Sequence, residues 1–531
     1  MITRLRSEHF DVLVVGGGIT GAGVALDAAS RGLRTALVEA EDFGSGTSSK
    51  SSKLVHGGIR YLQSGDVRLV YQALRERKRL RRNAPHLVKI LPFLLPVLKR
   101  DGLINRKVAR ALGSVMWMYD LTGGWRIGRL HKRLTADEAH RHMPTLPREN
   151  LAYGYVYYDA TVDDARLVLT IARTAAAHGA AVANRCRVTS FDHDDAGRVV
   201  GARVDTGDGE IVVSADVVVN AAGVWADEVR TLEDGTVTDM IRPAKGVHLT
   251  VPWSLLRNDI AAVIPVAGDQ RSLFVVPWGA GPRGPFTHTY IGTTDTDYEG
   301  RLEDPPCTAA DIDYVLGAVN AAVDAALTAD DVTGVWAGLR PLVRSAGSAR
   351  TADLSRRHRV TIGPSGVITV TGGKLTTYRE MAEDTVDEVL GLLGRRGRCR
   401  TKKLPVLGAV GFTEAAPGTR DAHLGDRYGT LAPAIDELIA KRPELAEPLV
   451  PRLPYLRAEA VYAARHEMAT TLVDVLTRRT RIHLLDREAT LGAAPGVADL
   501  LSVELGWDDT ERRRQLAAYH DLVAKEKADC R

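Results

Sequence analysis

The sequence predicts an α/β protein in three parts: a domain built on parallel strands, an antiparallel-sheet domain inserted into it, and a helical C-terminal domain. Three observations support this prediction. The chain opens with an apolar run, a glycine-rich turn and a helical pattern; short apolar runs follow one another over 245–295 without an intervening helix; and the residues after 403 are mostly helical in pattern. With 531 residues the chain is too long for one hydrophobic core.

The first element is a β-α-β unit with a glycine-rich turn. The apolar runs "DVLVV" and "TALVEA" are typical of buried parallel strands, and a helix is expected between them. In the turn Gly16-x-Gly18-x-x-Gly21, the first glycine makes the bend, the second lets the backbone approach a pyrophosphate and the third allows helix–strand packing. Glu39, about twenty residues on, is placed to accept a hydrogen bond from a ribose hydroxyl. We therefore expect a Rossmann-like, dinucleotide-binding domain. These residues alone do not distinguish a flavin dinucleotide from a nicotinamide dinucleotide.

The pattern of strand, glycine turn and helix occurs again on both sides of the antiparallel region over 245–295. An amphipathic helix is expected over 165–180, strand–turn–helix units over 215–229 and 367–393, and a further helix over 457–476. The domain ranges that we expect are 1–85, 150–240 and 330–395 for the discontinuous nucleotide-binding domain, 86–149 and 241–329 for the substrate-binding and membrane-facing domain, and 400–531 for the C-terminal domain.

The composition is that of an ordinary globular protein. Hydrophobic residues make up 45% and charged residues 26%, and a net charge of +4 is small for this length, so charge alone does not indicate a nucleic-acid partner. Four widely separated cysteines fit neither a metal site nor a disulfide framework, so we expect no metal and a reducing compartment. The first apolar run breaks into glycines after five residues, which indicates a strand rather than a signal peptide, and no stretch reaches the roughly 18 apolar residues of a transmembrane helix. We expect a cytoplasmic protein.

Six motifs in fixed order carry a resemblance to a known family. "VVGGGITGAGVALDAASRGL…LVEAEDF", "GTSSKSSKLVHGGIRYL", "VDDARLVL", "NAAGVWAD", "AGLRPL" and "TGGKLTTYR" together resemble the FAD-dependent, respiratory (aerobic-type) glycerol-3-phosphate dehydrogenases over roughly residues 10–395. The resemblance implies an FAD-binding domain of the glutathione-reductase/D-amino-acid-oxidase type, an inserted antiparallel-sheet substrate domain and a helical C-terminal cap.

The implied reaction is the oxidation of sn-glycerol 3-phosphate to dihydroxyacetone phosphate. Hydride passes from C2 to N5 of FAD, and the electrons then go to a quinone or another acceptor. The alternatives are an oxidase of the same family that uses oxygen, another FAD oxidoreductase acting on a small hydroxy acid or an amine, and a non-catalytic dinucleotide-binding or RNA-associated protein. Several arginines within the motifs favour a phosphate dianion over a carboxylate.

The same resemblance points to candidate residues for each chemical need. Arg60, Arg340 and Arg356 are candidates for binding the phosphate, and Tyr61 is expected to assist substrate binding. His56 and Lys374 are both candidates for accepting the hydroxyl proton, and the sequence does not rank them. Besides the three glycines of the turn and Glu39, the cofactor-binding candidates are Thr47, Ser48, Ser49, Ser51, Ser52, Gly57, Gly58, Val188, Ala222, Gly223, Gly372, Gly373, Lys374, Thr376 and Thr377. Lys245, His248, Thr293 and Thr294 are expected to face the flavin ring from the substrate domain.

Basic and apolar segments suggest contact with a membrane surface. Six of the eight residues over 75–82 are basic, and the following stretch over 86–100 is strongly apolar but interrupted by prolines. The mixture continues over 106–134, where Trp117 and Trp125 are suited to an interface. We expect peripheral association with the inner face of the cell membrane and no nucleic-acid partner; the oligomeric state stays open, with a homodimer as one alternative.

Overall fold

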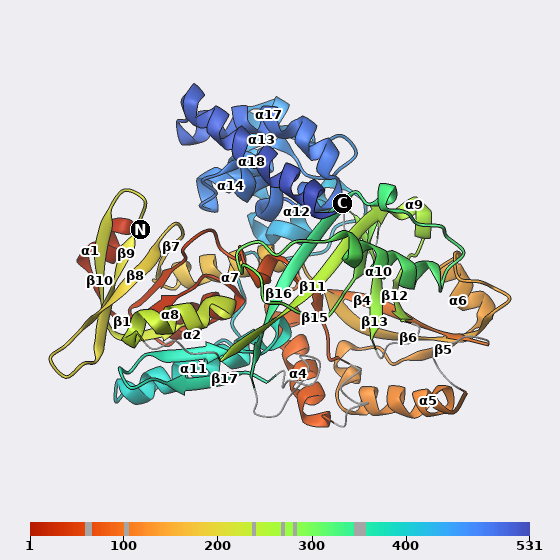
Figure 1. Ribbon diagram of the computed structural model, residues 1–531, viewed down its shortest axis with the longest axis horizontal. Coiled ribbons are helices and arrows are strands. Elements are labelled where there is room, and N and C mark those ends of the chain that lie inside the picture. Colours follow the sequence, from red (N-terminus) through yellow and green to blue (C-terminus); the bar gives the residue numbers. More distant parts are fainter. Residues whose placement is uncertain (59–65, 100–105, 236–239, 267–270, 280–283, 345–356) are drawn as a thin grey trace.

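The computed structural model describes residues 1–58, 66–99, 106–235, 240–266, 271–279, 284–344 and 357–531. Two sheets lie next to each other and the C-terminal helices lie over their junction (Figure 1). The α/β class and the three parts expected from the sequence are therefore confirmed.

The first sheet carries the predicted β-α-β unit. Its strand order is β17-β18-β10-β1-β2-β7, and neighbours from β18 to β7 pair in parallel, with the β8–β9 hairpin attached to β10. Its strands are β1 (His9–Val15), β2 (Thr35–Val38), β7 (Ala181–Ala183), β8 (Arg187–His193), β9 (Val199–Asp205), β10 (Glu210–Asn220), β17 (Arg359–Ile362) and β18 (Ile368–Thr371). Its helices are α1 (Ile2–Ser7), α2 (Ile19–Ser30), α7 (Asp164–Ala177), α8 (Ala226–Asp234) and α11 (Tyr378–Leu392).

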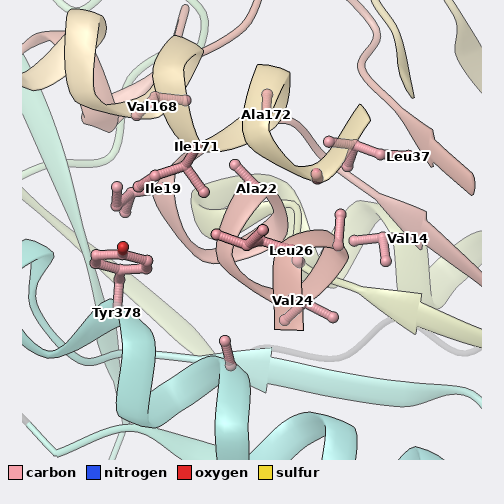
Figure 2. Packing of buried hydrophobic residues seen from close by; sticks show 14 of the residues in the cluster. Val14, Ile19, Ala22, Val24, Leu26, Leu37, Val168, Ile171, Ala172 and Tyr378 are labelled. Atoms are coloured by element: carbon pink, nitrogen blue, oxygen red, sulfur yellow. The ribbon is translucent and has the colours of Figure 1, made fainter. Parts of the chain in front are cut away.

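Helix α2 is buried between α7 and α11, and this packing fixes the glycine-rich turn at its start. Figure 2 shows Ile171 of α7 on one side of α2 and Tyr378 of α11 on the other. Gly23 allows the close approach, because a Cβ there would lie 2.6 Å from the Tyr378 ring. Leu26 is 3% exposed, and burying a side chain of this size contributes about 1.5–3 kcal/mol.

The second sheet is largely antiparallel and follows the order β15-β11-β14-β13-β12-β4-β6-β3, with β16 on β11 and β5 on β6. Its strands are β3 (Leu54–Val55), β4 (Lys89–Leu98), β5 (Lys132–Thr135), β6 (Leu151–Thr161), β11 (Ile241–Pro252), β12 (Ala261–Pro265), β13 (Ser272–Gly279), β14 (Phe286–Gly292), β15 (Thr296–Asp297) and β16 (Gly334–Val343). Its helices are α4 (Val67–Asn83), α5 (Arg106–Leu121), α6 (Ala136–His142), α9 (Trp253–Leu256) and α10 (Ala309–Asn320). The single turn α9 interrupts a region that we expected to contain no helix. Strands β6 and β16, from ranges expected in the nucleotide-binding domain, pair within this sheet.

Residues Lys89–Leu98 of the apolar stretch over 86–100 form strand β4 of this sheet rather than a membrane-facing segment. Strand β4 pairs with β6 on one side and β12 on the other. Phe93 and Leu94 are almost completely buried. The prediction of membrane contact for this stretch is wrong, because its side chains form the core of the second sheet.

Several of the basic residues over 75–82 bind other parts of the protein, whereas Lys78 and Arg82 are exposed. Arg77 is buried and donates to the Asp159 carboxylate and to the Tyr158 carbonyl at 2.8 Å. Arg75 pairs with Glu380 at 2.8 Å, so it connects α4 to α11. One face of helix α4 is therefore held against the rest of the protein, and the basic surface that we expected to face a membrane is reduced.

The C-terminal domain contains α12 (Arg420–Tyr428), α13 (Pro433–Lys441), α14 (Arg457–His466), α15 (Leu472–Asp474), α16 (Ile482–Leu485), α17 (Arg487–Leu505) and α18 (Asp509–Asp529), with a π-helical turn over Val475–Arg479. The helix expected over 457–476 is broken: α14 ends at His466, and Met468 takes a left-handed conformation with φ of 55°. Within the part of the chain that the structure describes, no helix is both long and apolar enough to cross a bilayer.

Candidate active site

A cavity of about 760 Å³ lies against the glycine-rich turn and extends to the second sheet. It is lined by the start of α2, the residues that follow β2, the serine-rich stretch over 44–56, parts of β11 and β16, and the turn that precedes α11. Residues far apart in the sequence therefore meet around one space.

One end of the cavity has the features of a dinucleotide site. Gly16 has φ of 106°, and a Cβ there would lie 2.8 Å from the Ala221 carbonyl oxygen. A Cβ on Gly18 would lie 3.2 Å from the Ser48 hydroxyl, which accepts a hydrogen bond from the Ile19 amide at 2.9 Å. The turn thus leaves only backbone where a pyrophosphate would approach the positive end of α2.

The acidic residue after β2 lies at the same end. The Glu39 carboxylate accepts hydrogen bonds from the Gly17 amide at 2.6 Å and the Glu41 amide at 2.8 Å. Desolvation raises the pKa of Glu39, although these two amide donors oppose the shift. Its position beside the turn is the one required for a ribose contact.

The other end is built by the turn before α11. Gly372 and Gly373 have φ of 73° and 79°, and a Cβ on Gly373 would lie 2.4 Å from the Met381 sulfur. Thr376 accepts from the His56 amide at 3.2 Å and so joins this turn to the serine-rich stretch. A helix start at this place offers positive potential to an anionic group.

A single cavity therefore combines a glycine turn with an acidic residue at one end and a glycine pair at a helix start at the other. This combination fits a cofactor with a dinucleotide part and a flat ring system, as FAD has.

Most of the cofactor candidates line the cavity: Gly16, Gly18, Glu39, Thr47, Ser48, Ser51, Ser52, Val188, Ala222, Gly223, Gly372, Gly373, Lys374 and Thr376. The others do not line it: Gly21, Ser49, Gly57, Gly58 and Thr377. Gly21 serves packing, because a Cβ there would lie 1.8 Å from the Gly16 carbonyl oxygen. A Cβ on Gly57 would lie 2.5 Å from Leu74, and the Thr377 hydroxyl donates to the Lys374 carbonyl at 3.3 Å.

Only some of the candidates for substrate binding and proton transfer lie in the described part of the chain. Arg340, His56 and Lys374 line the cavity. The Arg340 guanidinium pairs with Asp295 at 3.0 Å and donates to Thr293 at 3.1 Å. Arg60, Tyr61 and Arg356 lie outside the described residues.

Of the residues expected to face the ring from the second sheet, only His248 lines the cavity. The expectation for Lys245 is wrong: its ammonium group pairs with Asp311 at 2.6 Å and contacts the Pro306 carbonyl. Thr294 accepts from the Val247 amide at 3.0 Å, and Thr293 binds Arg340, so both are used within the sheet.

His248 has the most distinctive surroundings of these groups. Its Nε2 is 2.9 Å from the Ser52 hydroxyl, and its ring stacks on Trp336 with centroids 4.8 Å apart and planes 8° apart. Its Nδ1 is buried and has no hydrogen-bond partner among the described residues. Burial, followed by the charges of Lys53 and Arg340, lowers the pKa of His248 well below its ordinary value, so the ring is neutral.

Sequence reasoning missed the residues that hold this histidine. Lys53, Asp164 and Trp336 are adjacent to cavity-lining residues without lining the cavity themselves. Asp163 caps an amphipathic helix and Asp164 begins it, a pattern that gives no sign of a contact with Lys53. Only the fold brings these three side chains together.

Comparisons with known proteins agree with this geometry. Residues 11–379 match the family model described as FAD dependent oxidoreductase, and residues 399–512 match the C-terminal domain of alpha-glycerophosphate oxidase. The chain is 41% identical to glycerol-3-phosphate dehydrogenase 2 of Mycobacterium tuberculosis over 539 aligned residues, covering 98% of this chain and 89% of that protein. It is 38% identical to the mitochondrial glycerol-3-phosphate dehydrogenase SDP6 of Arabidopsis thaliana, covering 98% and 87%.

A solved structure extends the similarity to the whole fold. The glycerol-3-phosphate dehydrogenase of Bacillus halodurans, crystallised with FAD, superposes with a TM-score of 0.78 at 31% identity, covering 99% of this chain and 96% of that one. The L-alpha-glycerophosphate oxidase of Mycoplasma pneumoniae, at 17% identity and a TM-score of 0.56, shares the fold. With its cavity, its two family matches and these relatives, the chain belongs to the family of FAD-dependent glycerol-3-phosphate dehydrogenases.

Proposed function

We propose that this protein oxidises sn-glycerol 3-phosphate to dihydroxyacetone phosphate. The observation that carries the proposal is the meeting, in one cavity, of a dinucleotide-binding turn, the neutral His248 and the cationic Arg340. FAD, when bound, supplies the acceptor for the hydride that leaves C2 of the substrate. The residues of the chain bind the phosphate, orient the substrate and accept the hydroxyl proton.

Arg340 is the described residue best suited to the phosphate. Its side chain is 23% exposed and lines the cavity, while Asp295 and Thr293 hold the guanidinium in place. A guanidinium held in this way keeps a fixed positive charge at the cavity, which favours an anion such as phosphate. Arg60, Tyr61 and Arg356 are proposed to complete the phosphate site.

His248 is the best-placed acceptor for the proton of the C2 hydroxyl. With Nε2 unprotonated, the Ser52 hydroxyl donates to that nitrogen, and both residues line the cavity. A neutral imidazole in a desolvated site is available as a base, directly or through the serine. His56 and Lys374 remain alternatives for the same role.

The reaction is tested by the colour of the oxidised flavin. We expect the anaerobic holoenzyme to bleach with sn-glycerol 3-phosphate and not with glycerol or lactate. Failure to bleach with any phosphorylated polyol would contradict the proposed substrate. His248→Gln is expected to slow bleaching at least 100-fold; if His56→Gln or Lys374→Met has this effect and His248→Gln does not, the base is reassigned.

We propose a quinone as electron acceptor and an oxidase activity as the alternative. The resemblance to respiratory enzymes supports the quinone. Turnover with a quinone analogue, compared with turnover in oxygen alone while peroxide is measured, separates these possibilities. Peroxide formation at the full turnover rate would favour the oxidase.

We also propose that the protein binds the inner face of the cell membrane through helix α5 and the residues after it. Trp117, Leu121 and Leu130 are 54%, 76% and 51% exposed. Helix α5 lies beside α4 at one edge of the molecule (Figure 1). Exposed aromatic and aliphatic groups next to basic residues are typical of an interfacial surface. The side chain of Trp125 lies outside the described residues.

Co-sedimentation with vesicles containing an anionic lipid tests this surface. Trp117→Ser combined with Leu121→Ser should reduce the bound fraction at least several-fold, because apolar burial drives interfacial binding. Val503→Ser is the matched control, since Val503 is 73% exposed on the C-terminal domain. Equal binding of all three proteins would contradict the proposed surface.

A further inference from the structure

Lys53 is a buried charged residue directly behind the cavity. Its side chain is 3% exposed, and its ammonium group donates to the Ser49 carbonyl at 3.1 Å and to the two Asp164 oxygens at 3.2 and 3.3 Å. Its φ of 55° is unfavourable for a residue with a Cβ. A strained residue that also buries a charge must be held by its surroundings, and such residues cluster at functional sites.

The Lys53 ammonium group and the His248 ring contact the same indole. The Lys53 nitrogen lies 4.6 Å from the centroid of Trp336, on which the His248 ring stacks. The indole itself is fixed, because its N–H donates to the Ser51 carbonyl at 3.1 Å. Ser51 is held in turn, since its hydroxyl donates to Asp164 at 2.7 Å.

We propose that Lys53 is a positioning residue for the oxidation: held by Asp164, it places its charge against Trp336, fixes the plane of the His248 ring through that indole and helps to keep the ring neutral. The proposal rests on the proposed function in one respect, the role of His248 as proton acceptor. Lys53 itself does not line the cavity and acts through the indole and the histidine.

Charge supports this arrangement. Burial lowers the pKa of Lys53 to about 8, while Asp164 opposes the shift, so the lysine is mostly protonated at neutral pH. Among the described residues, the charged and titratable groups that face His248 are Lys53, Arg340 on β16 and Tyr290 on β14. Burial raises the pKa of Tyr290, so the phenol stays neutral. Lys53 and Arg340 are each paired with a carboxylate, Asp164 and Asp295, yet the charges that shift the pKa of His248 are those of the two cations. Burial first, and then the charges of Lys53 and Arg340, oppose protonation of the imidazole and keep it available as a base.

The C-terminal domain takes part in the clamp. Arg481 donates to Asp164 from the side of that domain and also to Asp163 at 3.0 Å. Arg481 is 1% exposed, so this ion pair is buried between the domains. The helical domain is thereby connected to His248 through Asp164, Lys53 and Trp336.

The test is the titration of His248 in the FAD-loaded protein, followed by NMR with ¹³C-labelled histidine side chains. The signals are assigned from His248→Gln and His86→Gln. In Lys53→Met we expect the midpoint of His248 to rise by about one pH unit, since a unit charge at this range acts through an effective dielectric constant of about 20. The acidic limb of the pH profile of kcat/KM should also move to higher pH. Lys53→Arg, which keeps the charge, should restore both.

Lys89 provides a matched control. It is also a buried, ion-paired lysine, and its nitrogen lies 4.5 Å from the centroid of Phe412, away from the cavity. Burial first, then the charge of Lys89, lowers the pKa of His86 to about 4. Lys89→Met should therefore shift the signal of His86 and leave that of His248 unchanged.

An unmoved His248 titration in folded, flavinated Lys53→Met would overturn the proposal. Lys53→Gln, whose amide can still donate to Ser49 and Asp164, replaces the methionine variant if that variant does not retain FAD. If neither neutral variant folds, a displaced His248 midpoint in Lys53→Arg contradicts the proposal and a normal one supports it. Full activity of His248→Gln would refute the proton-acceptor role alone, because the NMR shift in Lys53→Met would remain.

Discussion

Replacing Asp42 by asparagine should weaken the seam between the nucleotide-binding and C-terminal domains. The buried Asp42 carboxylate accepts from both terminal nitrogens of Arg479 at 2.7 Å and from Arg478 at 2.6 Å. Asn184 adds a hydrogen bond at 3.1 Å. The asparagine fills nearly the same space, so the perturbation is mainly the loss of one negative charge.

The magnitude follows from what remains behind. Arg479 is 1% exposed, and without Asp42 its positive charge stays buried and loses its carboxylate partner at this site. Breaking a buried ion pair on one side costs about 3–5 kcal/mol. The asparagine oxygen can still accept hydrogen bonds, and Arg479 also donates to the Glu467 carbonyl at 2.8 Å. The expected loss of stability is therefore near the lower end of this range. We expect about 3 kcal/mol.

Urea unfolding of the FAD-loaded protein, followed by flavin release and by circular dichroism, measures the change. The matched control is Asp137→Asn, which removes a carboxylate 2.8 Å from Arg148 when both side chains are more than half exposed. Exposed pairs contribute about 0–1 kcal/mol, so the control should be nearly neutral. Equal losses in the two variants, or a loss below about 1 kcal/mol for Asp42→Asn, would refute the reasoning from burial.

The same carboxylate gives a pH dependence of known sign. Burial alone would raise the pKa of Asp42, but Arg479 and Arg478 lower it well below its ordinary value. A depressed pKa stabilises the folded state fully above the unfolded value, about 3.9, and this stabilisation is lost as the pH falls further. The stability difference between wild type and Asp42→Asn should therefore be constant near pH 7 and shrink below about pH 4.

Two further substitutions test the cavity. Gly18→Val should largely abolish FAD binding, because even a Cβ at this position would lie 3.2 Å from the Ser48 hydroxyl; a fully flavinated variant in the absorption spectrum would contradict the assigned turn. Arg340→Ala should raise KM for sn-glycerol 3-phosphate roughly 10- to 100-fold with FAD retained, since a charged hydrogen bond contributes about 1.5–3 kcal/mol. Arg340→Lys should recover part of this loss, and near-normal kinetics for the alanine variant would exclude the phosphate contact.

The parts of the fold with local signals could be predicted from the sequence. The β-α-β unit follows from an apolar run, a glycine turn and an acidic residue at fixed spacing, and the structure has β1, α2 and β2 at these positions. The apolar stretch over 86–100 could not be assigned in this way. Its alternatives, a surface segment and a core strand, differ only in what covers the side chains, and the partners β6 and β12 are distant in sequence.

In the candidate site, too, only the features with a local sequence signal could be predicted. Glycines at tight turns could be predicted because their backbone requirement is local, as for Gly16 and Gly373. The choice between His56, Lys374 and His248 could not, because it depends on desolvation and on charges brought in from other elements. His248 is separated from Lys53 by almost two hundred residues, and only the pairing of β11 with β16 brings its ring onto Trp336.

The serine-rich stretch over 44–56 contacts several elements at once. Its serines and glycines make it resemble a linker, yet Ser48 contacts α2, Ser52 contacts His248 and the His56 amide contacts Thr376. Small residues let the backbone pass close to all three. Lys53, in their midst, connects this segment to Asp164 and through it to the C-terminal domain. A change in the C-terminal domain that displaces Arg481 should therefore alter the protonation of His248 before it alters FAD binding, since the glycine turn and Glu39 do not depend on that clamp.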